Sequence, residues 1–301
     1  MPRKKLLTTA AFVAISLVFP ALLSAAPEKH RVLIVDGFSN HDWKQTTRLT
    51  SRILEETGLF TVEVSTAPTS DDGQVRAAWR PDFSSYDAVI QNCNNLQNKV
   101  TWPEEVRTHL ENYVNSGGGL YILHSANNSF AEWDEYNKMI GLGWRKKDFG
   151  TAISITESGE IERIPPGEGT NTGHGPRNDV VLTKLSDHPI NKDFPAKWMA
   201  ADLEQYFYCR GPAENLTVLS YAREPKTGLN FPIEWTVKYG KGNVYNSTYG
   251  HVWENQDRPP GSRCIAFQTS FIRAMEWLCS GKTSYPLPEN FPTSTEIELG
   301  K

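Results

Sequence analysis

Three short, mainly apolar segments of this chain lead into a histidine. They are Val32–Val35 with His41, Leu120–Leu123 with His124, and Asn243–Tyr245 with His251. Apolar runs of this length are typical of strands that are covered on both faces of a parallel sheet. Because ligands bind outside the carboxyl ends of such strands, we expect the three imidazoles to converge at one edge of the sheet.

Helical patterns lie between these strands. One helix is expected to start near Asp42 and to end before Gly58, and another to end at the glycines 117–119. This alternation predicts βαβ units and a parallel sheet. Residues 151–234 contain strands between loops rich in glycine, proline and asparagine, which predicts an elaboration of the same sheet with some antiparallel pairing. The parallel pattern is expected to resume at residues 233–235.

The first residues predict a secretory signal peptide over residues 1–26. Residues 3–5 are basic, residues 6–23 are uncharged and largely apolar, and residues 24–26 are small, as a signal peptidase requires. A transmembrane anchor is the alternative, because the run approaches about 18 apolar residues. Pro20 interrupts the run and favours cleavage. We therefore expect an exported protein, periplasmic or extracellular, without stable membrane insertion after cleavage.

The composition is that of a globular protein. Its net charge of -4, with both signs interspersed, indicates no nucleic-acid partner. Residues 27–283 are expected to form a single α/β domain, because α/β folds of this size are commonly one unit, and residues 284–301 an irregular, poorly packed tail. Export permits disulfides, with buried free thiols as the alternative. The four cysteines are Cys93, Cys209, Cys264 and Cys279.

The turn at His124 resembles the nucleophile elbow of class I glutamine amidotransferases. A helix, three glycines and a strand precede it, and those enzymes place a cysteine at the same exit. Histidine at this position excludes cysteine chemistry there. The glycine-rich residues 167–175 lack the Lys-Ser/Thr pair of a phosphate-binding loop, so we expect a plain loop and no nucleotide cofactor.

A set of further motifs, in one order along the chain, resembles the ThuA-like (trehalose-utilisation) family over about residues 31–281. The motifs are Asp36–Gly37, Asn40–Trp43, Gly117–Gly119, Leu123–Ala126, His188–Ile190, Glu204, Tyr206, Gly211–Asn215, Tyr239–Gly242 and Gly250–His251. The resemblance implies a three-layer α/β fold of the flavodoxin and class I glutamine-amidotransferase type, with a mainly parallel sheet and an elaborated middle region. Leu203 is a departure, because the family usually has an acidic residue before the position of Glu204.

The resemblance also implies bacterial sugar metabolism, with a 3-keto-glycoside as the small carbohydrate substrate. A ketone at C3 acidifies the proton on C2. A general base can then remove this proton, and the substituent on C1 leaves by elimination. Ordinary glycosidases instead need two carboxylates that flank the glycosidic bond. We therefore expect a 3-keto-glycoside lyase or hydrolase, in which the final addition of water remains open.

His41, His124, His251 and Glu204 are the predicted catalytic residues. They suit either of two sites. In the first, they hold a divalent metal ion that acts as a Lewis acid on the ketone and the enolate. In the second, they act without metal as acid/base and hydrogen-bonding groups. His124 is the expected base, because an elbow-like turn would project it into the crevice and histidine titrates near neutrality.

Other residues are expected to contact the sugar. Trp43 and Tyr206 would orient its ring, and His174 would reach over the site from the glycine-rich loop. The remaining candidates for substrate contacts are Asn94, Ser125, Tyr249 and Trp253. Two alternatives to the enzyme also fit the sequence: a carbohydrate-binding module without chemistry, and a keto-sugar isomerase. The oligomeric state is left open, a homo-oligomer included.

Overall fold

The computed structural model describes residue 1, residues 28–70 and residues 72–300. Apart from Met1, the predicted signal peptide over residues 1–26 therefore lies outside the described residues. Among the helices that the structure describes, none has the length and apolar character needed to cross a membrane.

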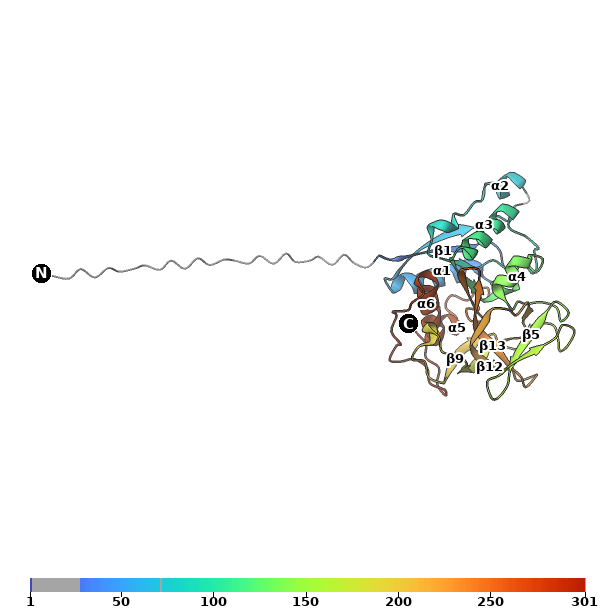
Figure 1. Cartoon of the computed structure of the whole chain (residues 1–301), viewed down its shortest axis with the longest axis vertical. Coiled ribbons are helices and arrows are strands. Elements are labelled where there is room, and N and C mark those ends of the chain that lie inside the picture. The colour runs from blue at the N-terminus through green and yellow to red at the C-terminus, as the bar shows by residue number, and fades with distance from the viewer. Residues whose placement is uncertain (2–27, 71, 301) are drawn as a thin grey trace.

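The centre of the fold is a twelve-stranded mixed sheet (Figure 1). Its first half runs in the order β2-β1-β3-β4-β14, and every neighbouring pair in that half is parallel. These strands are β1 (His30–Asp36), β2 (Phe60–Thr66), β3 (Ala88–Gln91), β4 (Gly119–Leu123) and β14 (Gly242–Ser247). Strands β1, β4 and β14 are the ones that the sequence places before the three histidines.

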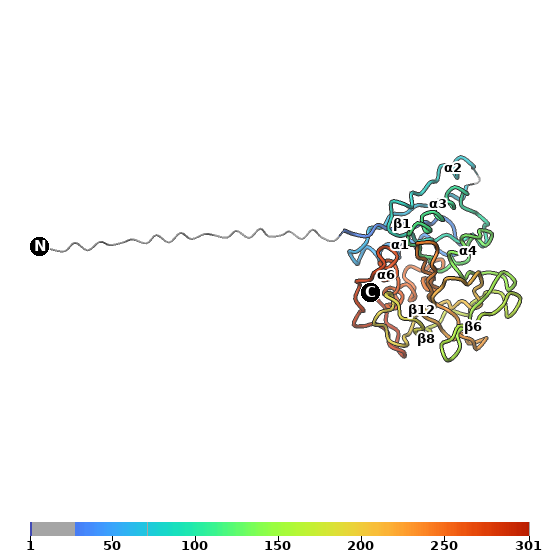
Figure 2. The backbone as a smooth tube through the Cα atoms, in the orientation of Figure 1, coloured from blue at the N-terminus to red at the C-terminus, as the bar shows by residue number. Residues whose placement is uncertain are grey.

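Helices cover both faces of this parallel half. Leu33 and Val35 of β1 pack on one side with residues of α3 and α4, whereas Val32 and Ile34 pack on the other with residues of α1 and α6. The chain returns at its end, so that α6 packs beside α1 (Figure 2). The longer helices are α1 (Trp43–Glu56), α3 (Glu104–Asn115), α4 (Asp134–Ile140) and α6 (Ile265–Ser280). The shorter ones are α2 (Gly73–Ala78) and α5 (Pro260–Arg263), with 3-10 turns η1 (Phe83–Ser85), η2 (His124–Asn128) and η3 (Pro189–Asn191).

Local sequence explains where the helices begin and end. The Asp42 carboxylate accepts a hydrogen bond from the Gln45 amide at 3.0 Å, which caps α1 at the predicted position. Gly281 ends α6 with φ of 73°, in the left-handed region that glycine adopts without strain. The three-layer α/β architecture predicted from sequence is confirmed.

The middle of the chain extends the same sheet with antiparallel strands, as predicted. Along the sheet, β12, β8 and β9 follow β13, and β5, β6 and β11 branch from it. Their bounds are β5 (Thr151–Ile155), β6 (Ile161–Ile164), β8 (Asn178–Lys184), β9 (Lys197–Leu203), β11 (Arg210–Gly211), β12 (Leu216–Arg223) and β13 (Asn230–Tyr239). The glycine-rich loop also contains one short strand, β7 (Gly173–His174), which pairs with β10 (Tyr206–Phe207) as a separate ribbon.

The prediction that residues 233–235 continue the parallel pattern is wrong. They belong to β13, which pairs antiparallel with β14 in a register that joins Tyr239 to Gly242. Only Gly240 and Lys241 connect the two strands, and a two-residue connection can join antiparallel strands but not parallel ones. Gly240 has φ of 54°, which suits such a turn.

Residues 284–300 contain no helix or extended strand, but several of their apolar side chains are half-buried against the domain. Phe291 packs against Phe194 with ring centroids 4.4 Å apart, and the Met199 amide donates to the Thr293 carbonyl at 2.8 Å. These contacts thus attach the segment to the domain, although its composition resembles that of a linker. All four cysteines lie in the described part of the chain, and all four are free thiols.

Candidate active site

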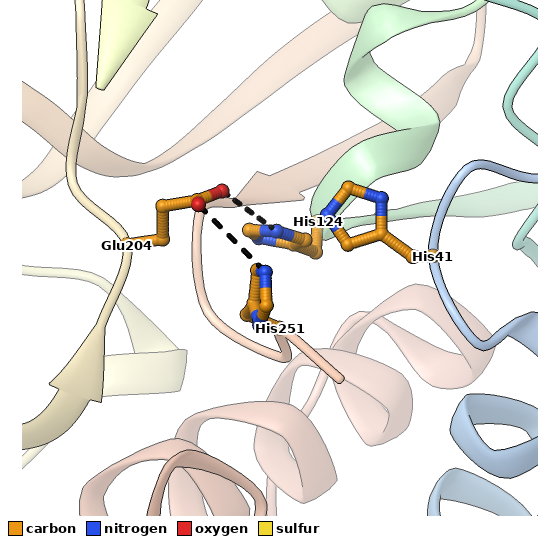
Figure 3. A group of neighbouring side chains, drawn as sticks. All are labelled: His41, His124, Glu204 and His251. Atoms are coloured by element: carbon orange, nitrogen blue, oxygen red, sulfur yellow. Dashed lines mark ion pairs between the residues drawn. The ribbon is translucent and has the colours of Figure 1, made fainter. Parts of the chain in front are cut away.

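Three adjacent loops at the carboxyl edge of the parallel strands carry the three histidines. His41 lies between β1 and α1, His124 follows β4 directly, and His251 lies just after β14. Their rings pack edge to face, with centroids 5.2 Å apart for His41 and His124, 4.9 Å for His41 and His251, and 5.1 Å for His124 and His251 (Figure 3). The predicted convergence is therefore observed.

Glu204 completes this cluster from the other half of the sheet. It follows β9, and its side chain faces the imidazoles (Figure 3). Its Oε2 lies 3.4 Å from Nε2 of His124, and its Oε1 lies 3.7 Å from Nε2 of His251. Only 7% of Glu204 is exposed. The carboxylate is thus held among three imidazoles, away from bulk water.

Hydrogen bonds on the outer side of two histidines orient their rings. His124 Nδ1 lies 2.8 Å from the Thr248 carbonyl, which can only accept, so Nδ1 carries a proton. His41 Nδ1 lies 3.0 Å from Oδ1 of Asn40, and the amide of Asn94 donates to that same oxygen. When either ring is neutral, it therefore keeps a lone pair on Nε2. Histidines that ligate metals have this arrangement, because the outer proton fixes the ring.

His251 differs from the other two. Its Nδ1 lies 3.1 Å from Nη1 of Arg177, and a guanidinium is a donor with no lone pair to offer. Arg177 also donates to Oε1 of Gln256 at 3.1 Å and lies 3.6 Å from Oδ2 of Asp202. His251 is consequently tied to a cation that is itself held by two further side chains.

The pKa values of the cluster reflect burial and mutual charge. Burial, followed by the charges of His124 and His251, lowers the pKa of His41 to about 2. Burial and the charge of His124 likewise lower the pKa of His251 to about 3. For Glu204 burial is the largest effect and raises the pKa. The hydrogen bond to His124 and the surrounding imidazoles outweigh it, so the pKa falls to about 2. Glu204 is an anion at neutral pH.

The four side chains fit a divalent metal ion. One ligand atom from each lies within 4.8 Å of the others, and three imidazoles with one carboxylate suit zinc or another first-row transition dication. The hydrogen bond between His124 and Glu204 needs a proton on Nε2 in addition to the Nδ1 proton that is directed to Thr248. A dication held by the four residues would replace that Nε2 proton. His251 is the exception, because Arg177 must leave its Nδ1 before Nε2 is free to ligate.

A hollow of about 360 Å³ opens directly onto the cluster. His41, His251 and Glu204 contribute to its walls, together with tryptophans 144 and 253. Four larger hollows, of about 650, 590, 730 and 540 Å³, lie elsewhere on the described surface, but none of them contains a cluster residue. We regard the smaller one as the candidate active site, because the ionisable groups converge there.

A family model described as "Trehalose utilisation", ThuA, matches residues 31–278. The chain belongs to the ThuA family. A structure of a putative ThuA-like protein from Parabacteroides merdae ATCC 43184 is 29% identical, with a TM-score of 0.84, and the match covers 90% of this chain and 98% of that one. No match was found among curated proteins.

More distant structural likenesses were also found for this ThuA family member. A β-galactosidase from Bacillus circulans sp. alkalophilus is 11% identical, with a TM-score of 0.49 over 86% of this chain and 32% of that one. A glutamine amidotransferase from Thermotoga maritima is 12% identical, with a TM-score of 0.37 over 73% of this chain and 75% of that one.

The predicted substrate residues divide into two groups. Tyr206 and His174 line the hollow. His174 is exposed, and its Nδ1 lies 3.2 Å from Oε1 of Glu204 and 2.6 Å from the Gly175 carbonyl. Trp253 also lines the hollow, whereas Tyr249 is buried in the core against Phe267.

Trp43, Asn94 and Ser125 are not among the residues that line the hollow. Trp43 starts α1, and the ammonium of Lys44 lies over its ring. Asn94 is buried and acts through Asn40, which it holds against His41. Ser125 is buried beside Ser39. Asn94 therefore positions a cluster residue through Asn40.

His124 is at the predicted elbow but does not line the hollow. Its φ of 43° places it in the strained left-handed region, as in a nucleophile elbow. However, only 2% of the residue is exposed, and its Nε2 faces Glu204 and the Tyr206 hydroxyl, 3.3 Å away. The sequence-based expectation that His124 is the base that meets the substrate is therefore not supported by its position.

Sequence reasoning missed Trp144 and Arg177, which also line the hollow. Trp144 packs edge-on against Tyr206, with ring centroids 5.0 Å apart. Neither residue follows a strand of the parallel half, so the pattern that found the histidines could not find them. The family departure at Leu203 has a simple structural basis, because Leu203 is buried in the core and the nearby carboxylate of Asp202 pairs with Arg177 instead.

Proposed function

We propose that this ThuA family member is a metal-dependent enzyme that cleaves 3-keto-glycosides. In this reaction the C2 proton is removed and the C1 substituent is eliminated. The observation that carries the proposal is that one ligand atom from each of the four cluster residues lies within 4.8 Å of the others, while the outer nitrogens of His41 and His124 are engaged. Such a cluster of ligands, open to a hollow, supports Lewis-acid chemistry on a carbonyl substrate.

His41, His124, His251 and Glu204 would hold the dication. Bound there, it would supply positive charge for the oxygen on C3, where charge develops as C2 loses its proton. Because Glu204 and His124 are buried, little water would reach the dication and screen its positive charge. Asn40 and the Thr248 carbonyl keep the imidazoles in orientation throughout.

His174 is the histidine left for proton transfer. It lines the hollow but is not one of the four clustered ligands, and its Nδ1 is engaged by the Gly175 carbonyl and Glu204. In the proposed reaction Nε2 takes the C2 proton, and the electron pair of that C–H bond forms the enolate. The C1–O bond then breaks as the C1=C2 double bond forms, and His174 returns its proton to the departing oxygen.

Metal analysis of purified protein tests the first half of this proposal. We expect about one dication for each chain, and loss of activity with a chelator that the metal reverses. Glu204→Gln should weaken metal binding by more than about 100-fold, since even outer partners of metal ligands contribute 10–100-fold. Glu254→Gln, at an exposed glutamate in the loop after His251, is the matched control. A protein that stays metal-free under saturating zinc, manganese, iron and nickel would contradict the proposal.

Turnover tests the second half. The wild-type protein should release the aglycone from a 3-keto-glycoside and leave the unoxidised parent intact. His174→Ala should lower this rate by about 100-fold or more while the metal content is unchanged. Equal rates on the two substrates would reject the keto-activated mechanism. Binding without consumption would indicate a carbohydrate-binding module, and a rearranged but intact glycoside would indicate an isomerase.

A further inference from the structure

Trp253 is an exposed tryptophan at the mouth of the candidate active site. It lies two residues after His251, and 44% of it is exposed. Its ring meets the His41 ring edge-on at 5.2 Å and lies nearly parallel to the His251 ring at 6.0 Å. A large apolar side chain exposed beside a polar cluster is a common mark of a ligand-binding surface, because exposed indole is unfavourable in water.

The loop that carries Trp253 is held in place from both sides. The Trp253 amide donates to Oε1 of Gln256 at 2.9 Å, and the Gln256 amide donates back to the Trp253 carbonyl at 3.2 Å. Arg177 donates to that same Oε1 and lies beside His251. The indole is thus fixed relative to the metal-ligand cluster before any ligand binds, which lowers the entropy lost on binding.

The walls of the hollow differ in their exposure to solvent. The hollow holds about 360 Å³, near the lower end of the range of about 300–1,000 Å³ for ligand pockets. Trp144 and Tyr206 in its wall are partly and fully buried, whereas Trp253 in the same wall remains open to solvent. We call the part beside the buried residues the inner region and the part over Trp253 the outer region. A ligand that fills the inner region can therefore extend outward over Trp253.

We propose that Trp253 is the platform of an outer subsite that binds the second ring of a two-ring glycoside. A pyranose has a face of C–H groups and a rim of hydroxyls, so it can stack on an indole while its rim stays in water. The reacting ring occupies the inner region beside His41 and Glu204, and the ring that leaves stacks on Trp253. Only the assignment of which ring reacts rests on the proposed function. The substrate class is a disaccharide or a glycoside with a cyclic aglycone.

Calorimetric titration with unoxidised sugars tests the subsite without any turnover. The probes are methyl α-glucoside against trehalose and maltose, and methyl β-glucoside against cellobiose, added to the protein as purified. We expect at least one disaccharide to bind about tenfold more tightly than its methyl glycoside, which is the order of one aromatic stacking contact. Trp253→Ala should abolish this difference, and Trp253→Phe should retain most of it.

Phe149→Ala is the matched control, since Phe149 is an aromatic side chain of similar exposure, 42%, that does not line the hollow. It should leave every affinity unchanged. The proposal is overturned if no disaccharide is preferred, if no sugar binds, or if Trp253→Ala weakens methyl glycosides and disaccharides equally. If the preference for disaccharides is found but no 3-keto-glycoside is consumed, the proposed function fails and the subsite stands.

Discussion

Arg177 and a bound metal would require different protonation states of the His251 ring. Because Arg177 can only donate, Nδ1 of His251 must accept, and the proton of the neutral ring then lies on Nε2, which faces Glu204. A metal ligand needs the lone pair of that same Nε2. Arg177 also places a positive charge beside the metal-ligand cluster. In the proposed metal site, the arginine and a dication would therefore compete for His251, whereas Arg177 makes no such contact with His41 or His124.

Replacing Arg177 should consequently strengthen metal binding. We expect Arg177→Met to lower the Kd for zinc by about tenfold, which corresponds to ~1.4 kcal/mol and is within the range for one unfavourable charge near a partly buried site. Competition with a chromophoric chelator measures this affinity. Arg223→Met is the control, at an exposed arginine that pairs with Glu157. Weaker zinc binding in Arg177→Met would show that Arg177 supports the site instead of opposing it.

At the scale of elements, Arg145 holds the turn η2 that follows the elbow at His124. Arg145 is 4% exposed, and its guanidinium donates to the carbonyls of Asn128 at 3.2 Å and Ser129 at 2.7 Å. It also donates to Oδ1 of Asn137 at 2.8 Å, which ties η2 to α4. Main-chain carbonyls and one side-chain amide oxygen, and not a carboxylate, thus receive the hydrogen bonds of a buried cation.

Loss of this guanidinium should leave several buried carbonyls without donors. We expect Arg145→Met to lower the free energy of unfolding by about 3 kcal/mol or more, since each buried unsatisfied group costs about 1–3 kcal/mol. Arg145→Lys should not restore the stability, because an ammonium cannot reproduce the planar fork of donors. Urea unfolding followed by circular dichroism measures the effect. Arg52→Met, at an exposed arginine, serves as control, and an equal loss in that variant would contradict the argument.

The C-terminal segment acts as a further packed element. Deleting residues 284–301 removes Phe291 from Phe194 and removes the carbonyl that receives the Met199 amide. We expect this deletion to lower the free energy of unfolding by about 3 kcal/mol, because five half-buried apolar side chains of the segment pack against the core and full burial of one contributes about 1.5–3 kcal/mol. Phe291→Ala alone should account for a substantial part of this loss. Unchanged urea unfolding of the truncated protein would show that the segment contributes nothing to stability.

For the whole molecule, the histidine cluster should make the metal-free protein sensitive to acid. The lowered pKa values of His41 and His251 mean that, between about pH 6.5 and pH 3, the unfolded chain binds protons that the folded protein does not. Stability is then lost as the pH falls below about 6.5. The lowered pKa of Glu204 acts in the same direction below about pH 4.5.

We expect the free energy of unfolding, measured with chelator present, to be about 4 kcal/mol lower at pH 5 than at pH 7, because each of the two histidines contributes about 2 kcal/mol. The double variant His41→Gln and His251→Gln should show a weaker dependence on pH, because its folded and unfolded states bind protons more equally. Urea unfolding at both pH values, for both proteins, gives the comparison. A wild-type stability that is the same at pH 5 and pH 7 would contradict the lowered pKa values.

Much of the parallel half could be predicted because its signals are local. An apolar run of four or five residues specifies a buried strand, and parallel strands end at the same edge of the sheet. This logic placed His41, His124 and His251 together. The antiparallel direction of β13 also had a local signal, the two-residue connection at Gly240 and Lys241, which the apolar pattern of residues 233–235 obscured.

Contacts between distant segments could not be predicted in this way. Glu204 was found through a family motif, and nothing in its own neighbourhood indicates that β9 delivers it to the imidazoles. Arg177 reaches His251 across 74 residues of sequence. Such pairings depend on where the loops around β7, β9 and β10 lie relative to the parallel half, and that arrangement is set by the packing of the whole chain.

Trp43 and Trp253 show most clearly the difference between what local sequence specifies and what long-range packing decides. Each lies two residues after a histidine of the cluster, so the sequence alone makes them equivalent. Asp42 caps α1, and Trp43 becomes the first residue of that helix, outside the residues that line the hollow. Trp253 lies in a loop closed by Gln256, and its indole packs on the rings of His41 and His251. Local pattern specified the strands and the edge at which they end, whereas long-range packing decided which aromatic side chain reaches the site.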